Sequence, residues 1–200
     1  MSTVNSSPPS SPVRSNRPDV IVMLLLVASL CLNIYLGWKV KHGTSTVEQN
    51  TAKLSPGMKI DPVTALGADG KPLTISYDST NKPTVFYVIS PSCIWCRRNQ
   101  ANINKLMDSK AGDFRFIGLS LADSGLKEYV EDHHLKFPVY TGLKEETIRS
   151  LGLGGTPETI VVSPEGKILK VWAGAYVERL QPEVEAYFEV QLPGLTSLND

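Results

Sequence analysis

Along residues 57–190, stretches with the apolar pattern of a β-strand alternate with stretches that have the apolar spacing of a helix. Short runs rich in β-branched and aromatic residues are separated by stretches in which apolar residues recur every three to four positions, a pattern typical of strands alternating with helices. The predicted strands are 59–66, 71–75, 84–89, 114–121, 137–140, 158–163 and 167–172, and the predicted helices are 93–110, 123–134, 144–151 and 178–190. This order predicts an α/β sandwich around one sheet, which the hairpin at 158–172 makes mixed.

The N-terminal region has a different pattern. Residues 1–19 are rich in Ser, Pro and Asn and are predicted to form a disordered tail. Val20–Trp38 carries no charge, and its length matches a single membrane-spanning helix of about 20 residues. Residues 39–55 are polar and are predicted to be a tether. The folded domain is expected at 56–192, followed by a C-terminal tail at 193–200.

Two alternatives to a retained membrane anchor fit the sequence less well. A cleaved signal peptide has a shorter apolar run followed by an Ala-x-Ala site, which this sequence lacks. A lipoprotein would need a small residue before Cys31, where Leu30 stands. Basic residues flank Val20–Trp38 on both sides in similar number, so the positive-inside rule leaves the orientation open.

Net charge excludes one class of partner. The chain has 20 basic and 20 acidic residues, so its formal net charge is zero. Nucleic-acid binding depends on a basic surface that neutralises phosphates. No nucleic-acid partner is therefore expected.

Two cysteines, Cys93 and Cys96, lie between the apolar run 84–89 and a helical pattern. The run is apolar on both faces, which is typical of a central strand, so we predict a strand, a tight turn and a helix that begins at the first cysteine. Unpaired N–H groups and the helix dipole favour a thiolate there and lower the pKa of Cys93, and Arg97 adds positive potential. We expect Cys93 to attack and the more enclosed Cys96 to resolve the mixed disulfide.

A Cys-x-x-Cys pair can also bind zinc or form a structural disulfide. Zinc needs two further ligands, and the remaining candidates are Cys31, inside the apolar run, and the adjacent His133 and His134 on a charged stretch. So short a disulfide loop constrains the unfolded chain little, which argues against a structural bridge. Redox chemistry, with no metal and no cofactor, is the interpretation we favour.

A glycine-rich segment at 152–155 precedes Thr156, Pro157 and the predicted strand at 158. Proline is tolerated at the entrance of a strand, and glycines permit a close approach to another loop. We predict a cis Thr156–Pro157 bond packed against Cys93. Cis bonds are uncommon even before proline, so this prediction rests on pairing the loop with the Cys-x-x-Cys motif.

Together these features resemble the thioredoxin fold. A strand, Cys93-x-x-Cys96 and a helix are followed by Gly155-Thr156-Pro157 and a β-hairpin. The hairpin at 59–75 and the insertion near 121–151 look more like the membrane-anchored, TlpA-like branch, which includes extracytoplasmic disulfide reductases of cytochrome c maturation. The resemblance covers about residues 55–190. It implies a thioredoxin-like three-layer sandwich with a mixed central sheet, in addition to the one N-terminal transmembrane helix.

The resemblance also implies roles for single residues. Cys93 would be the exposed nucleophile, Cys96 the resolving thiol and Pro157 the cis-proline beside them. Thr156 would offer its backbone to an extended substrate segment. Glu158 matches a Pro-Glu-Thr sequence of the cytochrome-maturation members, in which a nearby acidic residue tunes the thiols.

The sequence departs from the family pattern around the motif. Ser92 stands where a tryptophan usually precedes the first cysteine, and Trp95 lies between the cysteines instead, where it is a candidate for substrate docking. Asn99 stands where many TlpA-like reductases have a glutamate, and Tyr87 where cytosolic thioredoxins have a buried aspartate. Glu158 is the remaining candidate for an internal carboxylate; the alternative is a solvated residue on an edge strand.

Three functions are compatible with these residues. The first is a thiol–disulfide oxidoreductase anchored by residues 20–38 in the inner membrane, acting in the periplasm on proteins with cysteines or disulfides and served by a membrane or periplasmic redox partner. The second is a thiol peroxidase, but Phe86 stands where a proline is expected before the peroxidatic cysteine. The third is a copper or zinc carrier, but copper carriers of this fold usually have a wider cysteine spacing and a histidine. We favour the first, with the direction of electron transfer left open.

Overall fold

The computed structural model describes the backbone of residues 17–43 and 54–197 and, within the first range, the side chains of residues 20–35. The chain divides into two units, 1–48 and 49–200. Helix α1 (Arg17–Gly43) contains the predicted span at 20–38 and extends beyond it at both ends. Within the residues described, no helix combines the length and the hydropathy needed to cross a membrane. The span at 20–38 stays a prediction, and most of the predicted tail and tether lies outside the described residues.

The folded unit contains the strands and helices of an α/β domain. In chain order they are β1 (Val63–Leu66), β2 (Pro72–Ile75), the 3-10 turn η1 (Asp78–Thr80), β3 (Thr84–Ile89), α2 (Ile94–Arg98), α3 (Gln100–Lys110), β4 (Arg115–Ser120), α4 (Leu126–Asp132), β5 (Val139–Tyr140), α5 (Glu145–Ser150), β6 (Glu158–Val162), β7 (Ile168–Ala173) and α6 (Leu180–Phe188). The predicted order of strands and helices is confirmed.

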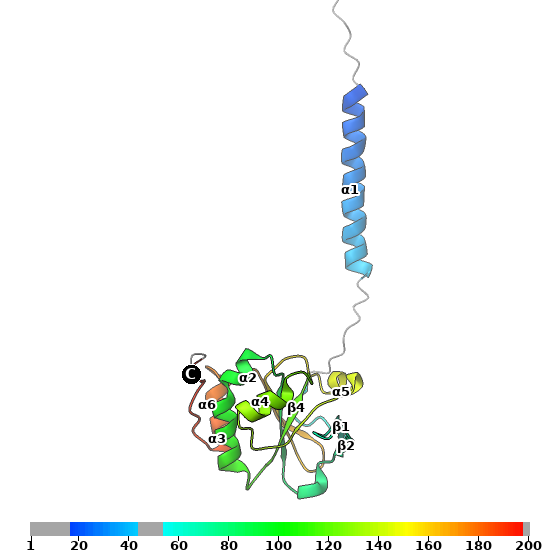
Figure 1. The fold of residues 1–200 in the computed structure, drawn as a ribbon. Coiled ribbons are helices and arrows are strands. Elements are labelled where there is room, and N and C mark those ends of the chain that lie inside the picture. The colour runs from blue at the N-terminus through cyan, green and yellow to red at the C-terminus, as the bar shows by residue number, and fades with distance from the viewer. Residues whose placement is uncertain (1–16, 44–53, 198–200) are drawn as a thin grey trace, which may run out of the picture. The chain divides into compact units, whose positions relative to one another are not determined.

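The main sheet is mixed, as predicted, and β3 is its central strand. Its order is β5-β4-β3-β6-β7, in which β3 runs parallel to β4 and antiparallel to β6. Strands β1 and β2 form a separate antiparallel pair, which confirms the first hairpin. Helices α3 and α6 lie on one side of the sheet, and α5 and the β1–β2 hairpin lie on the other (Figure 1). The predicted three layers are therefore present.

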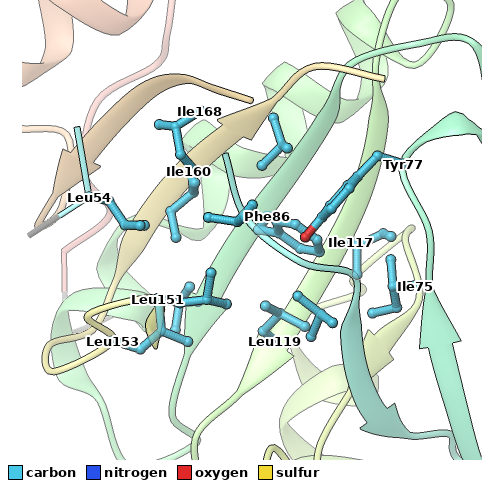
Figure 2. Packing of buried hydrophobic residues seen from close by; sticks show 14 of the residues in the cluster. Leu54, Ile75, Tyr77, Phe86, Ile117, Leu119, Leu151, Leu153, Ile160 and Ile168 are labelled. Carbon is cyan, nitrogen blue, oxygen red and sulfur yellow. The ribbon is translucent and has the colours of Figure 1, made fainter. Parts of the chain in front are cut away.

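Side chains that alternate along β3 fill two separate cores. Phe86 and Val88 belong to the core beneath the β1–β2 hairpin and α5, which Figure 2 shows with Ile160 of β6. Tyr87 and Ile89 belong to the opposite core beneath α3 and α6. Because successive side chains of a strand point to opposite faces, each residue of β3 and β6 is assigned to a face by its position in the sequence.

The helix predicted at 93–110 is two helices, α2 and α3, which meet at Asn99. Asn99 is fully buried, and its side chain is hydrogen-bonded to other parts of the domain. Asparagine competes with helical backbone bonding through its own side chain, which accounts for the break. The C-terminal segment is also held, since Gly194 N–H donates to Asn102 Oδ1 at 2.9 Å and Thr196 N–H donates to the Arg98 carbonyl at 2.9 Å.

Candidate active site

The redox motif begins where the central strand ends. After β3 the chain turns through residues 90–92, with the Cys93 N–H donating to the Ser90 carbonyl at 2.9 Å. Cys93 is the N-cap of α2 and is bonded to Cys96 as a disulfide, with their Cα atoms 5.3 Å apart. Cys93 is partly exposed, whereas Cys96 is fully buried. The expected difference in access between the two cysteines is confirmed.

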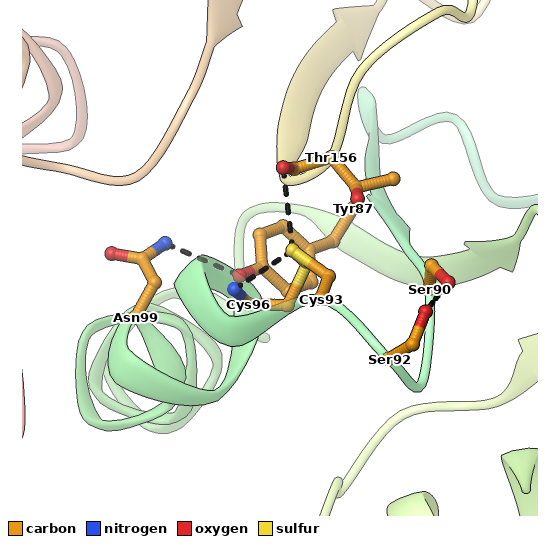
Figure 3. The surroundings of a disulfide bond; sticks show 7 residues. All are labelled: Tyr87, Ser90, Ser92, Cys93, Cys96, Asn99 and Thr156. Atoms are coloured by element: carbon orange, nitrogen blue, oxygen red, sulfur yellow. Dashed lines mark hydrogen bonds between the residues drawn. A yellow bond between two sulfur atoms is a disulfide. The ribbon is translucent and has the colours of Figure 1, made fainter. Parts of the chain in front are cut away.

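Two backbone groups converge on the Cys93 sulfur (Figure 3). The Cys96 N–H donates to Cys93 Sγ at 3.1 Å, and the Thr156 carbonyl oxygen lies 3.3 Å from the same sulfur. Once the disulfide is reduced, the N–H group stabilises a thiolate at Cys93, and the carbonyl can accept a hydrogen bond from the Cys93 thiol. The site can therefore hold Cys93 in either protonation state.

The loop that supplies Thr156 has the predicted conformation. The Thr156–Pro157 peptide bond is cis, and Pro157 is buried directly before β6. The Pro157 carbonyl accepts a hydrogen bond from Gly174 N–H at 2.8 Å, which ties the loop to the end of β7. The predicted packing of this loop against Cys93 is confirmed by the contact of Thr156 with the sulfur.

A network of neutral polar groups lies in the same core as Cys96. Asn99 Nδ2 donates to the Tyr87 hydroxyl at 3.2 Å, and Asn99 Oδ1 accepts from Asn102 Nδ2 at 2.9 Å and from Tyr176 N–H at 3.1 Å. The Tyr176 hydroxyl in turn lies 2.6 Å from Thr159 Oγ1. Burial raises the pKa of Tyr87 far above its usual value, so its hydroxyl stays protonated.

Tyr87 and Asn99 occupy the two positions at which the family resemblance leads us to expect a carboxylate. In this chain the two residues are hydrogen-bonded to each other. Two neutral side chains that bond to each other therefore stand in place of the two expected carboxylates, and no charge lies at these two positions of the core that encloses Cys96.

Glu158 lies on the opposite face of the sheet. It is the first residue of β6, between β3 and β7, and its position places it on the face of Ile160. Only 8% of its surface is exposed, and its carboxyl group has no hydrogen-bond or ion-pair partner in the described chain. Burial raises its pKa from the usual 4.5 to about 7. The alternative of a solvated edge-strand residue is wrong.

Glu158, Thr156 and Pro157 line one cleft of about 650 Å³, which also contains the basic side chains of Lys170 and Arg179. The cis-proline loop thus connects the Cys93 sulfur with the buried carboxyl group. Glu158 is placed near the redox loop as expected, while its influence on the thiols stays a prediction.

Two further predicted residues lie on α2. Trp95 is 46% exposed, and the Arg98 guanidinium lies over its ring at 4.9 Å from the ring centre. Arg97 is exposed, and its charge acts on α4: burial raises the pKa of Tyr129 to about 12, and Arg97 opposes that shift. Tuning of Cys93 by Arg97 remains a prediction.

Asn102, Tyr176 and Thr159 were not singled out from the sequence. The sequence does contain a signal for Asn102. Together with Asn99, it continues the spacing of the buried Ile103 and Leu106 on the inner face of α3. A polar residue at such a position needs a buried partner. Its partners lie too far away in the sequence to be identified by spacing.

Comparison with known proteins places the chain among redox proteins. Residues 55–188 match the Redoxin family. The chain belongs to the redoxin family. Two relatives of this redoxin are both named thiol-disulfide oxidoreductase ResA. The protein from Bacillus thuringiensis subsp. konkukian is 22% identical over 177 residues, covering 87% of this chain and 95% of the relative. The protein from Bacillus subtilis is 21% identical over 179 residues, covering 88% and 93%.

Solved structures agree with the fold of this redoxin. The thioredoxin domain of a thiol-disulfide oxidoreductase from Bacteroides vulgatus has a TM-score of 0.57 and 21% identity, covering 68% of this chain and 99% of that domain. A thiol:disulfide interchange protein DsbE from Chlorobium tepidum has a TM-score of 0.57 and 22% identity, with the same coverage. The predicted thioredoxin fold and the TlpA-like oxidoreductase class are confirmed.

Proposed function

We propose that this redoxin exchanges the Cys93–Cys96 disulfide with cysteines of protein substrates. The observation that carries the proposal is the partly exposed Cys93 sulfur, bonded to a fully buried Cys96 and 3.3 Å from the Thr156 carbonyl. A substrate sulfur can reach Cys93 but not Cys96. The mixed disulfide therefore forms at Cys93, and Cys96 resolves it from within the protein.

In the reducing direction, the Cys93 thiolate attacks one sulfur of a substrate disulfide. The substrate S–S bond breaks, a bond between Cys93 and the substrate forms, and the other substrate sulfur leaves as a thiolate that takes a proton from solvent. The Cys96 thiolate then attacks Cys93, which restores the Cys93–Cys96 disulfide and releases the second substrate thiolate. Two electrons pass to the substrate, and the oxidising direction is the same sequence reversed.

Thr156 is suited to hold an extended substrate segment during these steps. Its side chain is partly exposed, and its backbone N–H has no backbone partner among the described residues. A substrate strand pairing with this backbone would place its cysteine beside Cys93. Trp95, exposed on α2 between the two cysteines, is a second candidate contact for the same substrate.

Substitution of the cysteines tests the exchange reaction. Cys93→Ser is expected to abolish reduction of insulin disulfides by the protein, because the only accessible sulfur of the motif is lost. Cys96→Ala is expected to retain substrates as covalent complexes, because nothing resolves the mixed disulfide. Cys31→Ser is the matched control and is expected to react like the wild type. Unchanged exchange rates in Cys93→Ser would contradict the proposal.

Membrane attachment is also part of the proposal, and the composition of Val20–Trp38 supports it. Apolar side chains of α1 are exposed around the helix from Val20 to Tyr35. The side chain of the polar Asn33 donates to the Ser29 carbonyl of the same helix at 2.9 Å, so this hydrogen bond needs no water. Such a helix is suited to lipid. We place the redox domain in the periplasm and its substrates among proteins of cytochrome c maturation, on the family resemblance.

Two experiments in cells test location and partner. The protein is expected to remain in the membrane fraction after carbonate washing and to lose its C-terminal domain to protease added to the periplasmic side. Covalent complexes of Cys96→Ala are expected to contain a cytochrome c precursor or a protein that delivers electrons to it. Recovery of the full chain in the soluble fraction would contradict the anchor.

A further inference from the structure

Exposed apolar side chains are few on the domain and concentrate at the redox motif. Across residues 54–197, the exposed large hydrophobic side chains are those of Met58, Ile94, Trp95 and Leu169. Ile94 and Trp95 lie between the two redox cysteines, with 41% and 46% of their surfaces exposed. Large apolar side chains grouped at the surface typically mark a binding site, and tryptophan contributes more than most residues to such contacts.

Two arginines follow directly on the same short helix. We call Ile94, Trp95, Arg97 and Arg98 the α2 surface. Arg98 is held in place, because its guanidinium stacks on Trp95 and its Nε donates to the Thr196 carbonyl at 3.3 Å. Within the described chain, neither arginine has an ion-pair partner at 4 Å or less. Two positive charges therefore stand beside an exposed apolar pair.

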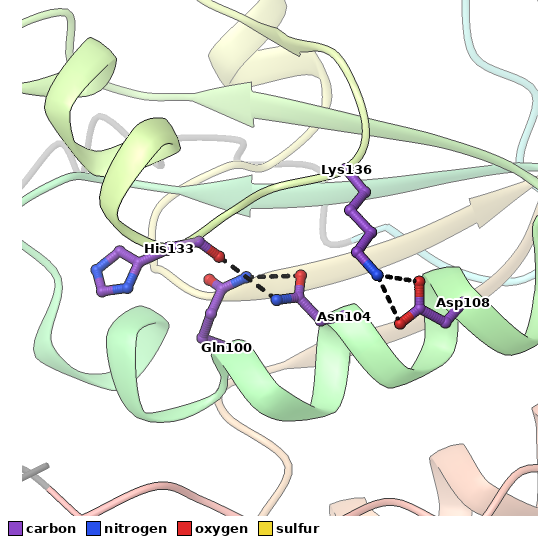
Figure 4. A network of polar contacts seen from close by, with 5 residues as sticks. All are labelled: Gln100, Asn104, Asp108, His133 and Lys136. Atoms are coloured by element: carbon purple, nitrogen blue, oxygen red, sulfur yellow. Dashed lines mark hydrogen bonds and ion pairs between the residues drawn. The ribbon is translucent and has the colours of Figure 1, made fainter.

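The arginines border a hollow of about 410 Å³ between α2, the start of α3 and the end of α4. Its wall is fixed by hydrogen bonds shown in Figure 4: Gln100 Nε2 donates to Asn104 Oδ1 at 2.9 Å, and Asn104 Nδ2 donates to the His133 carbonyl at 3.4 Å. Among the described residues that line it, Asp132 is the one carboxylate. Burial lowers the pKa of His133, so its ring is neutral at neutral pH. The hollow is pre-formed, and the described residues that line it carry a net positive charge.

The hollow is close enough to Cys93 to be filled by a bound substrate. At a rise of about 1.5 Å per residue, Arg97 lies about 6 Å along α2 from Cys93. An extended peptide covers that distance in about two residues, at about 3.3 Å each. A carboxylate about two or three residues from the reacting cysteine can therefore reach the arginines.

We propose that the α2 surface docks protein substrates that carry an apolar residue and a carboxylate within about three residues of the cysteine that reacts with Cys93. This inference rests on the proposed exchange reaction and adds a substrate preference to it. The apolar residue packs on Ile94 and Trp95, and the carboxylate pairs with Arg97 and Arg98.

Peptide disulfides of one sequence test this preference. Each carries a single cysteine as a 2-pyridyl disulfide and has Glu, Gln or Lys at the second or third position on either side. The rate of pyridine-2-thione release by the reduced protein is measured. With Glu on one of the two sides of the cysteine, the peptide is expected to react about two- to five-fold faster than its Gln counterpart, as for an exposed ion pair. This rate advantage is expected to shrink in 0.5 M salt. A Glu placed eight residues away is expected to give no advantage.

Arg97→Gln is expected to lower the Glu-to-Gln rate ratio toward one, because one of the two arginines that pair with the carboxylate is lost. The ratio is used because loss of the charge is also expected to alter the reactivity of Cys93, which the rate with neutral 2,2′-dipyridyl disulfide measures separately. The matched control is Arg149→Gln, an exposed arginine on α5 that pairs with Glu145, and it is expected to keep the wild-type ratio. Equal rates with the Glu, Gln and Lys peptides, or an unchanged ratio in Arg97→Gln, would overturn the docking proposal. If no peptide reacts while dipyridyl disulfide is consumed, the exchange with protein substrates fails instead.

Discussion

The two faces of the central sheet differ in how their buried polar groups are paired beside the redox site. On the face that holds Cys96, the Asn99 side chain meets Tyr87, Asn102 and Tyr176 through hydrogen bonds of 2.9 to 3.2 Å, and all of these groups are neutral. On the other face, the carboxyl group of Glu158 is buried without a partner in the described chain, and its pKa rises to about 7.

The comparison separates two uses of burial. A neutral polar group that finds its partners fixes the position of the elements that carry it. Here that fixes the junction of α2 and α3 against β3. A carboxyl group that finds none changes its charge close to neutral pH. The first arrangement fixes the end of α2, the helix that carries Cys96. The second gives the cleft lined by Pro157 and Glu158 a group that can gain or lose a proton in the physiological range.

The largest test of this difference is Asn99→Ala. The substitution leaves the Tyr87 hydroxyl, Asn102 Nδ2 and the Tyr176 N–H without a buried partner, and each such group costs about 1–3 kcal/mol. We expect the free energy of unfolding in urea to fall by about 3–5 kcal/mol. Asn104→Ala on the same helix, at a less buried position, is expected to cost under about 1 kcal/mol. If Asn99→Ala also lowered the free energy of unfolding by less than about 1 kcal/mol, the network would not stabilise the fold.

A smaller effect with a distinct pH signature is expected for Glu158→Gln. Because burial raises the folded-state pKa of Glu158 from 4.5 to about 7, the unfolded chain loses its proton first, and wild-type stability declines as the pH rises between these values. The variant lacks this decline, so its stability relative to the wild type should increase from pH 4.5 to pH 7 and then level off. Urea unfolding at several pH values measures the difference.

Glu165→Gln provides a control of opposite sign. The Ser163 hydrogen bond lowers the pKa of Glu165, an exposed carboxylate in the β6–β7 hairpin. The ionised Glu165 therefore stabilises the folded state at a pH above its usual pKa, and this stabilisation is lost as the pH falls. If Glu158→Gln and Glu165→Gln gave the same pH dependence, the assignment of a raised pKa to Glu158 would be wrong.

The smallest expected effect is that of Tyr87→Phe. It removes one hydroxyl and leaves Asn99 Nδ2 unpaired, at a cost of about 1 kcal/mol. Because burial keeps Tyr87 protonated, the cost should be the same at pH 5 and pH 8. A cost that varies with pH over this range would place an ionising group in the network.

Much of the site could be predicted because its chemistry is local in sequence. Cys93 and Cys96 are separated by one helical turn, and the apolar run before them predicts the central strand that presents them. The cis Thr156–Pro157 bond was also predicted, but only by pairing the glycine-rich loop with the distant Cys-x-x-Cys motif. The break in the helix at Asn99 was missed, since the apolar spacing continues across it and the partners of Asn99 lie elsewhere in the chain.

The sequence by itself determined the order of strands and helices and the redox pair, because short-range periodicity and side-chain chemistry are sufficient for these. Only the tertiary structure decided that Tyr87 and Asn99, which lie on different elements, bond to each other, and that Glu158 is buried without a partner. Both outcomes depend on which side chains from distant parts of the sequence are buried next to one another. That is settled when α3 packs on one face of the sheet and the β1–β2 hairpin and α5 pack on the other.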